Sequence, residues 1–357
     1  MKITDIRDEI VRIPMRIPLK VAYGVIDNMT SVFVKIVTDE GVYGIGEAAP
    51  LAQVMGDSVD TIRLALRTFK LALIGMDAMD IEGIHRAMDG LLAHNTSAKC
   101  AVDLALYDIR GKIMGQPLYK VLGGADAHVE SDVTIGIQTP EDMAREAKAY
   151  ADQGFRILKI KAGIDPDEDL RALRLIREAV GSKVRIRVDA NQGYDEATAV
   201  FILPRLKELG VDAVEQFLPG WDMEGTARIR RQAGGVKIMV DESLHGPRDA
   251  MRMCRLDAAD TFNIKLMKCG GIYPAMQINA IAEACGVTCM VGCMLETKIG
   301  LTAALSVVAA RGNITEADCD SHLFAKDPEM GMPGGFTFRG SDFILCDKPG
   351  IGVDYDF

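Results

Sequence analysis

Five short runs of β-branched and apolar residues in the middle of the chain each end on an ionisable residue. The successive end residues lie 28, 26, 26 and 24 positions apart. One strand, one helix and two short loops fill roughly 30 residues, so each interval predicts one βα unit. Because barrel enzymes carry their chemistry where parallel strands end at the mouth of a (β/α) barrel, we expect these end residues to converge there. They are Lys161, Asp189, Glu215, Asp241 and Lys265.

Three of these residues are carboxylates, which would repel one another strongly unless a cation neutralised them. An all-oxygen set of ligands favours a hard ion such as Mg²⁺. The alternative is that each residue caps a following helix or forms a surface ion pair. That explanation suits any one of them better than five in succession at this spacing.

The residues before the barrel predict an α+β unit. Its expected strands span 3–13, 31–38 and 42–47, with a long connection at 14–30 and a second loop at 48–57. Expected helices follow at 58–73, 81–92 and 97–114. From Val129 the pattern changes to alternating strands and helices, which indicates a parallel barrel.

The barrel pattern ends with expected strands at 287–291 and 314–318 and a helix at 299–310 between them. No clear eighth helix follows, and residues 324–357 predict irregular structure and short strands that return to the first domain. We therefore expect an α/β fold, a modified TIM-like barrel at 126–324 with an α+β capping domain at 1–125 that 325–357 completes.

Composition excludes several classes of protein. The 357 residues are 48% hydrophobic and carry a net charge of −10, which argues against a nucleic-acid or anionic-membrane partner. No stretch approaches the roughly 20 apolar residues of a membrane span, and the charged start does not fit a signal peptide, so we expect a cytoplasmic protein. The eight cysteines lack a CxxC pair and the five histidines lack HExxH spacing, so we expect reduced thiols and no histidine-based metal site.

Two lysines on one strand predict acid–base chemistry. Alternate residues of a strand face the same side, so Lys159 and Lys161 both point into the barrel. Neighbouring ammonium groups disfavour each other's charge, which lowers the pKa of one toward neutrality. With Lys265 across the barrel, the arrangement suits abstraction of a proton α to a carboxylate through a metal-stabilised enediolate. Bases on both faces would invert the carbon.

The motifs around these residues resemble the enolase superfamily, muconate-lactonizing subgroup, over nearly the whole chain. The resemblance implies a (β/α)7β barrel, one Mg²⁺ per subunit on Asp189, Glu215 and Asp241, and acid–base catalysis by Lys161 and Lys265. It also implies that Lys159 assists Lys161 and the substrate carboxylate, that Asn191 lies just behind the metal ligands, and that the protein is a homo-oligomer. The motifs are Lys159-Ile160-Lys161, Asp189-Ala190-Asn191-Gln192, Glu215-Gln216, Asp241-Glu242-Ser243, Asn263 to Gly271 and Gln116-Pro117-Leu118-Tyr119.

One departure from the subgroup follows the Glu215-Gln216 pair. Members commonly have proline there, whereas this chain has Phe217 and reaches proline only at Pro219. The departure puts the path of that loop in doubt more than the ligand.

A pair of carboxylates at the end of the last expected strand indicates the substrate. Asp318 and Asp320 are two residues apart and so share one face at the barrel mouth. This Asp-x-Asp resembles dipeptide epimerases, where it holds a free α-ammonium group, and Met290 to Thr297, with Glu296, is similar to the same enzymes. For N-acylated substrates, two carboxylates would be repulsive. The alternative is a solvated loop with an Asx turn.

The cap loops bear on the side chain of the second residue. In relatives that take acidic side chains this loop offers an arginine, whose place Gly24 takes here. Tyr23, Val25, Val54 and Met55 make the loops mostly apolar. We therefore expect a non-acidic, hydrophobic second residue, with Tyr23, Gly24 and Val54 at the substrate. Lys20 would serve as an anion-binding group instead, or as a surface lysine.

The resulting hypothesis is a Mg²⁺-dependent dipeptide epimerase that inverts the C-terminal residue of L,L-dipeptides with Lys161 and Lys265 as bases. The small-molecule dipeptide is its expected partner. The alternatives are an N-acylamino acid racemase, an o-succinylbenzoate synthase or a cycloisomerase on the same scaffold. A non-catalytic dipeptide- or metal-binding barrel is a further alternative, which the retention of a lysine on each face argues against.

Overall fold

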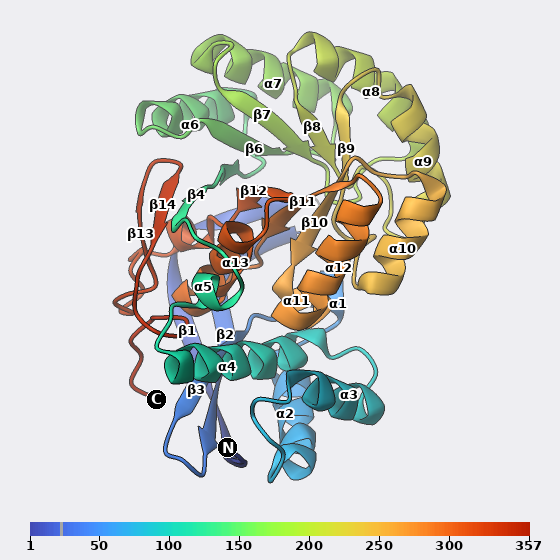
Figure 1. The fold of residues 1–357 in the computed structure, drawn as a ribbon. Coiled ribbons are helices and arrows are strands. Elements are labelled where there is room, and N and C mark those ends of the chain that lie inside the picture. The colour runs from blue at the N-terminus through green and yellow to red at the C-terminus, as the bar shows by residue number, and fades with distance from the viewer. Residues whose placement is uncertain (22–23) are drawn as a thin grey trace.

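Eight parallel strands form the centre of the molecule in the computed structural model, which describes residues 1–21 and 24–357 (Figure 1). The strand order is β12-β11-β10-β9-β8-β7-β6-β5, and a parallel bridge from Ser131 to Ala317 joins the two ends. The strands are β5 (Val133–Ile135), β6 (Ile157–Lys161), β7 (Arg185–Asp189), β8 (Ala213–Glu215), β9 (Lys237–Val240), β10 (Thr261–Lys265), β11 (Thr288–Gly292) and β12 (Ile314–Asp318).

A helical connection follows each of the first seven barrel strands. After β12 the only helix in the described chain is the one-turn 3₁₀ helix η1 (Ser321–Phe324). The expected (β/α)7β barrel is therefore confirmed. The helices are α6 (Pro140–Asp152), α7 (Pro166–Val180), α8 (Glu196–Glu208), α9 (Met223–Gln232), α10 (Pro247–Leu256), the short α11 (Leu266–Cys269) with α12 (Ile272–Ala284), and α13 (Lys298–Ala310).

Helix α7 illustrates how local sequence sets these boundaries. The Asp165 side chain accepts hydrogen bonds from the backbone N–H groups of Asp167 and Glu168, and Pro166 occupies the first turn. Both features are favourable at a helix N-terminus. Leu170, among other apolar residues, is buried against the barrel, as the spacing predicts.

The cap contains a three-stranded antiparallel sheet, β1-β2-β3, beside a group of helices (Figure 1). Strand β3 packs directly on α4: a Cβ at Gly44 or at Gly46 would lie 2.0 Å from a backbone oxygen of that helix. Only glycine permits such a close approach. The elements are β1 (Ile3–Val21), β2 (Gly24–Thr38), β3 (Tyr43–Ala48), α1 (Ala52–Met55), α2 (Val59–Leu73), α3 (Ile81–Leu91), α4 (Thr96–Met114) and α5 (Leu118–Val121).

The long connection expected at residues 14–30 is wrong, because strands β1 and β2 continue through it as a hairpin. A register shift between Pro14 and Leu19 lets the edge strand accommodate prolines, which cannot donate to the sheet. The hairpin reaches the barrel, since Arg16 lies 3.3 Å from the Tyr150 hydroxyl on α6. It also contacts the C-terminal segment, where Lys326 N–H donates to Pro14 O at 2.8 Å.

The C-terminal segment forms most of a third, three-stranded sheet. Its strand β13 (Phe336–Arg339) pairs with β14 (Asp342–Leu345), and β14 pairs with β4 (His128–Glu130), a small sheet that the sequence did not predict. The segment then returns to the cap as expected, where the rings of Tyr355 and Phe33 lie 4.9 Å apart.

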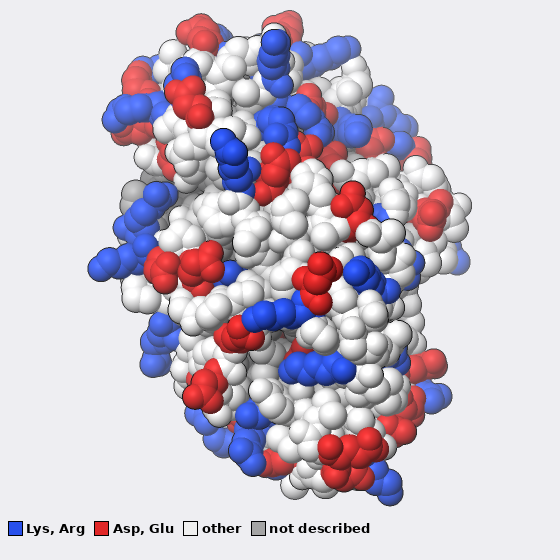
Figure 2. Space-filling view, turned by 60° about the vertical axis from the view of Figure 1, so that its left-hand side comes forward, with Lys and Arg blue, Asp and Glu red and all other residues white. Residues whose placement is uncertain are grey.

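The outer surface is mixed in charge. On the face shown in Figure 2, basic and acidic side chains are interspersed among neutral residues. Within the described residues, no helix combines the length and apolar character that crossing a membrane requires.

Candidate active site

A cavity of about 60 Å³ lies at the mouth of the barrel, under the cap. Leu51 and Val54 of the cap line one side of it. The barrel contributes a set of polar and ionisable side chains to the other sides. They are Thr134, Lys159, Lys161, Asn191, Asp241, Glu242, Lys265, Asp318, Asp320 and Ser321.

The alternation of strand residues determines which side chains meet inside the barrel. The register pairs Lys161 with Asp189 and Asp189 with Glu215, so the ends of β6, β7 and β8 lie in one layer. Lys161 Nζ donates to Asp189 Oδ2 at 2.8 Å and to Asn191 Oδ1 at 2.9 Å. Asn191 has a positive φ of 42°, a conformation that asparagine tolerates better than most residues. Its backbone conformation thus turns the amide toward Lys161.

Lys159 is almost completely buried and connects three carboxylates. Its Nζ lies 3.0 Å from Asp189 Oδ2, 2.9 Å from Glu215 Oε2 and 2.7 Å from Asp318 Oδ2. Burial lowers the pKa of Lys159, but Asp189, Asp318 and Glu215 raise it further, and the result is well above the usual value. For Lys159 the carboxylates outweigh any effect of the neighbouring lysine. The lowered pKa expected for one lysine of the pair stays a prediction.

Lys265 projects from the opposite side of the barrel. Its Nζ lies 2.9 Å from Asp241 Oδ2. A Cβ at Gly292 on the neighbouring strand β11 would lie 3.1 Å from Lys265 Cε, so glycine leaves space for this side chain. Burial lowers the pKa of Lys265, whereas Asp241 raises it, to a value well above the usual one.

Lys268 on α11 orients Asp241 from outside the cavity. It is fully buried, and its Nζ lies 2.5 Å from Asp241 Oδ1 and 3.1 Å from Asn263 O. Burial raises the pKa of Asp241, but Lys265 and Lys268 lower it more, so it lies below the usual value. Lys268 lies within the motif from Asn263 to Gly271, but the sequence alone indicated no role for it.

The chemistry of the expected metal ligands suits a hard cation. Asp189, Glu215 and Asp241 are each at most 1% exposed and offer only oxygen donors. Glu215 Oε2 accepts no hydrogen bond from a described residue. Ammonium groups already stand beside all three, since Lys159 contacts two of them and Lys265 the third. Positive charge is thus what this part of the barrel accommodates.

A different set of carboxylates is the closest packed. Oxygen atoms of Asp132, Asp318 and Asp320 all lie within 4.8 Å of one another, the only such group of three among the described residues. Burial and Asp318 raise the pKa of Asp320 to about 6. The backbone N–H of Thr134 donates to Asp320 Oδ2 at 2.5 Å. Asp318 and Asp320 thus lie buried at the mouth rather than in a solvated loop.

The remaining expected substrate residues differ in position. Val54 lines the cavity, and Gly24 begins strand β2. Glu296 does not line the cavity: it is fully buried and accepts from Met294 N–H at 2.9 Å. Tyr23 lies outside the described residues, as does the side chain of Lys20.

The departure at Phe217 has a packing explanation. Phe217 is 5% exposed and its ring lies 5.2 Å from that of Tyr194 in an edge-to-face arrangement. Tyr194 N–H also donates to Phe217 O at 3.0 Å. The loop after Glu215 is therefore fixed by an aromatic pair at the position where the resemblance led us to expect proline.

Sequence reasoning missed two further polar residues near the site. Glu242 lines the cavity, accepts from Asn191 Nδ2 at 3.2 Å, and has its pKa raised to about 8 by burial and by Asp241. Asp132 lies behind Asp318 and Asp320. Asp132 immediately precedes β5, and no local sequence pattern indicates that it lies close to Asp318.

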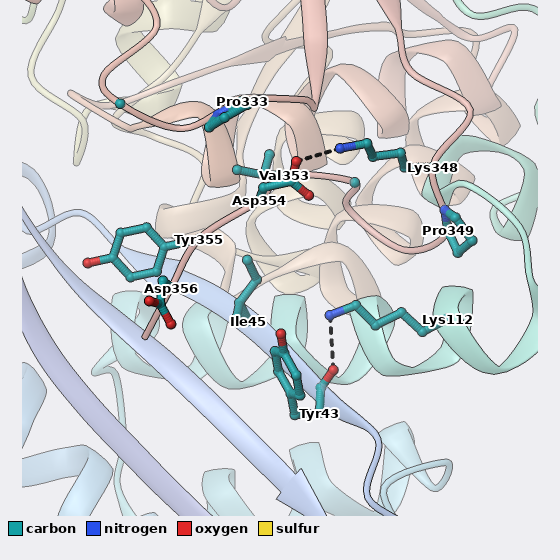
Figure 3. Close-up of a pocket in the computed structure, with 12 residues that line it drawn as sticks. Tyr43, Ile45, Lys112, Pro333, Lys348, Pro349, Val353, Asp354, Tyr355 and Asp356 are labelled. Atoms are coloured by element: carbon teal, nitrogen blue, oxygen red, sulfur yellow. Dashed lines mark hydrogen bonds and ion pairs between the residues drawn. The ribbon is translucent and has the colours of Figure 1, made fainter.

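A larger hollow of about 930 Å³ lies between the cap and the C-terminal segment (Figure 3). Its two lysines are already engaged: Lys112 donates to Tyr43 O at 3.0 Å and Lys348 pairs with Asp354 at 2.5 Å. The carboxylates that line it, Asp354 and Asp356, are exposed, whereas those of the smaller cavity are buried. Chemistry, rather than size, identifies the smaller cavity as the candidate active site.

Comparisons with known proteins agree with this placement. Residues 4–123 match the family described as mandelate racemase / muconate lactonizing enzyme, N-terminal domain, and residues 142–357 match the enolase C-terminal domain-like family. The chain is 42% identical to an L-Ala-D/L-Glu epimerase from Bacillus subtilis, over 99% of this chain and 97% of the relative. It is 39% identical to a hydrophobic dipeptide epimerase from Enterococcus faecalis, over 99% and 100%.

An N-succinyl-L-Arg/Lys racemase from Bacillus cereus is 38% identical over 99% of this chain and 95% of the relative. Among solved structures, the Bacillus subtilis L-Ala-D/L-Glu epimerase in a substrate-liganded complex superposes with a TM-score of 0.95 at 42% identity, covering 99% of each chain. The Enterococcus faecalis dipeptide epimerase complexed with Mg and L-Leu-L-Tyr gives 0.96 at 37% identity, covering 99% and 100%. This chain therefore belongs to the mandelate racemase / muconate lactonizing enzyme family of the enolase superfamily.

Proposed function

We propose that this protein is a Mg²⁺-dependent dipeptide epimerase that inverts the α-carbon of the C-terminal residue of L,L-dipeptides. One observation carries the proposal: a single cavity is lined by Lys161 and Lys265 and also by the Asp318 and Asp320 carboxylates. A base on each face suits inversion of a carbon, and the carboxylates suit an ammonium group. Relatives described as dipeptide epimerases span nearly the whole chain.

In this mechanism, Lys161 removes the α-proton from the L-centre and Lys265 delivers a proton to the opposite face. Asn191 orients Lys161 through the 2.9 Å hydrogen bond to its Nζ. Lys159 assists Lys161 and binds the substrate carboxylate. Asp189, Glu215 and Asp241 would hold Mg²⁺, whose charge stabilises the negative charge that develops on the substrate carboxylate.

We infer a non-acidic, hydrophobic second residue. Leu51, Val54, Leu295 and Phe324 line the cavity. The basic residues among its described lining are Lys159, Lys161 and Lys265, and each already has a role in proton transfer or carboxylate binding. No further cation among them is left for an acidic side chain.

We also propose the division into a cap of residues 1–125 with 325–357 and a barrel of 126–324.

The decisive experiment follows solvent deuterium into the α-carbon. The Mg²⁺-loaded protein is incubated in D₂O with L-Ala-L-X dipeptides and, separately, with N-succinyl amino acids. We expect exchange and epimerisation of dipeptides with apolar X. Lys265→Ala should stop epimerisation while L-face exchange continues, and full turnover by that variant would remove Lys265 from the mechanism.

The second candidate is an N-acylamino acid racemase. The 38% identity to the N-succinyl-L-Arg/Lys racemase supports it, since that value is close to those of the dipeptide epimerases. Exchange confined to the succinylated substrates would establish this function and overturn the dipeptide assignment.

A further inference from the structure

A charged group lies directly beneath the mouth of the barrel and takes no part in the proposed proton transfer. Asp132, Arg187 and Glu316 are 0%, 1% and 7% exposed. Arg187 Nη2 lies 2.9 Å from Asp132 Oδ2, and its Nη1 lies 3.2 Å from Glu316 Oε2. None of these residues lines the cavity. Since burying three charges is costly, their arrangement calls for a functional reason.

Asp132 faces the Asp318 and Asp320 carboxylates. Oxygen atoms of the three residues lie within 4.8 Å of one another. Neither oxygen of Asp132 accepts a hydrogen bond from a described residue, so its contact with Arg187 is an ion pair and its acceptor capacity remains. The backbone N–H of Thr134, two residues later, donates to Asp320 Oδ2 at 2.5 Å. The segment from Asp132 to Thr134 therefore places both a carboxylate and a positioning amide at this point.

The cations that pair with these aspartates are shared with other carboxylates. Lys159 pairs with Asp318 and also with Asp189 and Glu215, and Arg187 pairs with Asp132 and also with Glu316. Burial, and to a lesser extent Asp318, raises the pKa of Asp132 well above its usual value. A primary ammonium group between Asp318 and Asp320 would add a positive charge here, whereas an N-acyl group would not.

We propose that Asp132, held in place by Arg187, is a specificity-determining positioning residue that sets the Asp318–Asp320 pair to accept a primary ammonium group and to reject an uncharged N-acyl group. This inference rests on the proposed function. It explains why a buried ion pair lies beneath these carboxylates, away from the lysines that transfer protons.

The test compares two substrates that differ in one group. L-alanyl-L-leucine carries the ammonium, and propionyl-L-leucine is the same molecule without it. In Asp132→Asn, we expect the KM for L-alanyl-L-leucine to rise at least about tenfold with kcat little changed. Deuterium exchange into propionyl-L-leucine should be unchanged or faster, so the preference for the ammonium substrate falls at least about tenfold.

Glu316→Gln is the matched control. It removes the other carboxylate from the same guanidinium, with a similar loss of a buried ion pair, but Glu316 is not part of the close-packed trio. Its substrate preference should match that of the unaltered protein. Should Asp132→Asn fail to fold, Asp132→Glu keeps the ion pair and moves the charge, and is expected to change the KM of the dipeptide at least about threefold without changing propionyl-L-leucine exchange.

Three results would overturn the inference. One is that Asp132→Asn changes the activity toward both substrates by the same factor. The same result for Asp132→Glu would count where that variant is used. Another is that Asp132→Asn and Glu316→Gln show the same preference for L-alanyl-L-leucine over propionyl-L-leucine. The third is loss of Mg²⁺-induced stabilisation in Asp132→Asn, which would make the trio a metal site. If the unaltered protein turns over no dipeptide, the proposed function itself fails and the inference falls with it.

Discussion

At the scale of single residues, the site is a balance between carboxylates and lysines within a few ångströms of each other. Lys159 alone contacts carboxylates from three strands, at 2.7 to 3.0 Å. Strand-end spacing predicted most members of this set. Lys268 and Asp132 escaped prediction because their contacts with Asp241 and Asp318 join segments that are remote in sequence, and no local pattern encodes that distance.

Asp320 gives a prediction for pH. Burial and Asp318 raise its pKa to about 6, so it is ionised above that pH and becomes neutral as the pH falls below it. Only the ionised form attracts a substrate ammonium. The ratio of kcat/KM for L-alanyl-L-leucine to that for propionyl-L-leucine should therefore fall about tenfold from pH 7 to pH 5.

Taking the ratio cancels ionisations that both substrates share, such as those of the catalytic lysines. Asp320→Asn is the control and should remove most of the pH dependence. A ratio that stays constant from pH 7 to pH 5 in the unaltered protein would show that Asp320 does not bind the ammonium.

At the scale of elements, helix and strand positions were largely predictable. Periodicity placed the barrel strands and α13 to within a few residues, because buried strands and amphipathic helices carry local patterns. The β1–β2 hairpin was missed since Pro14 and Pro18 indicate a loop in isolation, whereas an edge strand with a register shift accommodates them. Thr297 is the local N-cap of α13, but the additional acceptor that Glu47 on β3 supplies to this helix end was unpredictable.

Glu47 should therefore matter for stability more than an ordinary helix cap. It is fully buried and accepts hydrogen bonds from Thr297 N–H at 2.8 Å and Gly300 N–H at 2.8 Å, and from Ser31 at 2.6 Å. Glu47→Ala leaves these donors unsatisfied, so we expect the free energy of unfolding to fall by about 3 kcal/mol in urea denaturation. The control Ser58→Ala removes a local cap of α2 and should cost only about 1 kcal/mol. Equal losses would show that the cross-domain cap contributes nothing special.

At the scale of the whole molecule, the cap and the barrel complete one site together. Leu51 and Val54 come from the cap, and the acids and bases come from the barrel. The spacing of strand ends predicted the barrel face, but how far the cap closes over it depends on packing across hundreds of residues. The carboxylates at the strand ends come together only when the barrel is folded. An ion that binds them therefore stabilises the entire fold.

This linkage predicts that Mg²⁺ stabilises the folded protein. A cation that binds only the folded state, at a concentration a hundredfold above its Kd, adds about 2.7 kcal/mol to the free energy of unfolding, which should raise the Tm by several degrees. Differential scanning calorimetry with and without Mg²⁺ measures the shift. Asp241→Asn should abolish it, while Asp212→Asn, which alters a carboxylate paired with Arg185 away from the mouth, should keep it. Because each variant is compared with itself, a general loss of stability in Asp241→Asn does not affect the result. Equal shifts in both variants would mean that Mg²⁺ binds somewhere other than the end of β9.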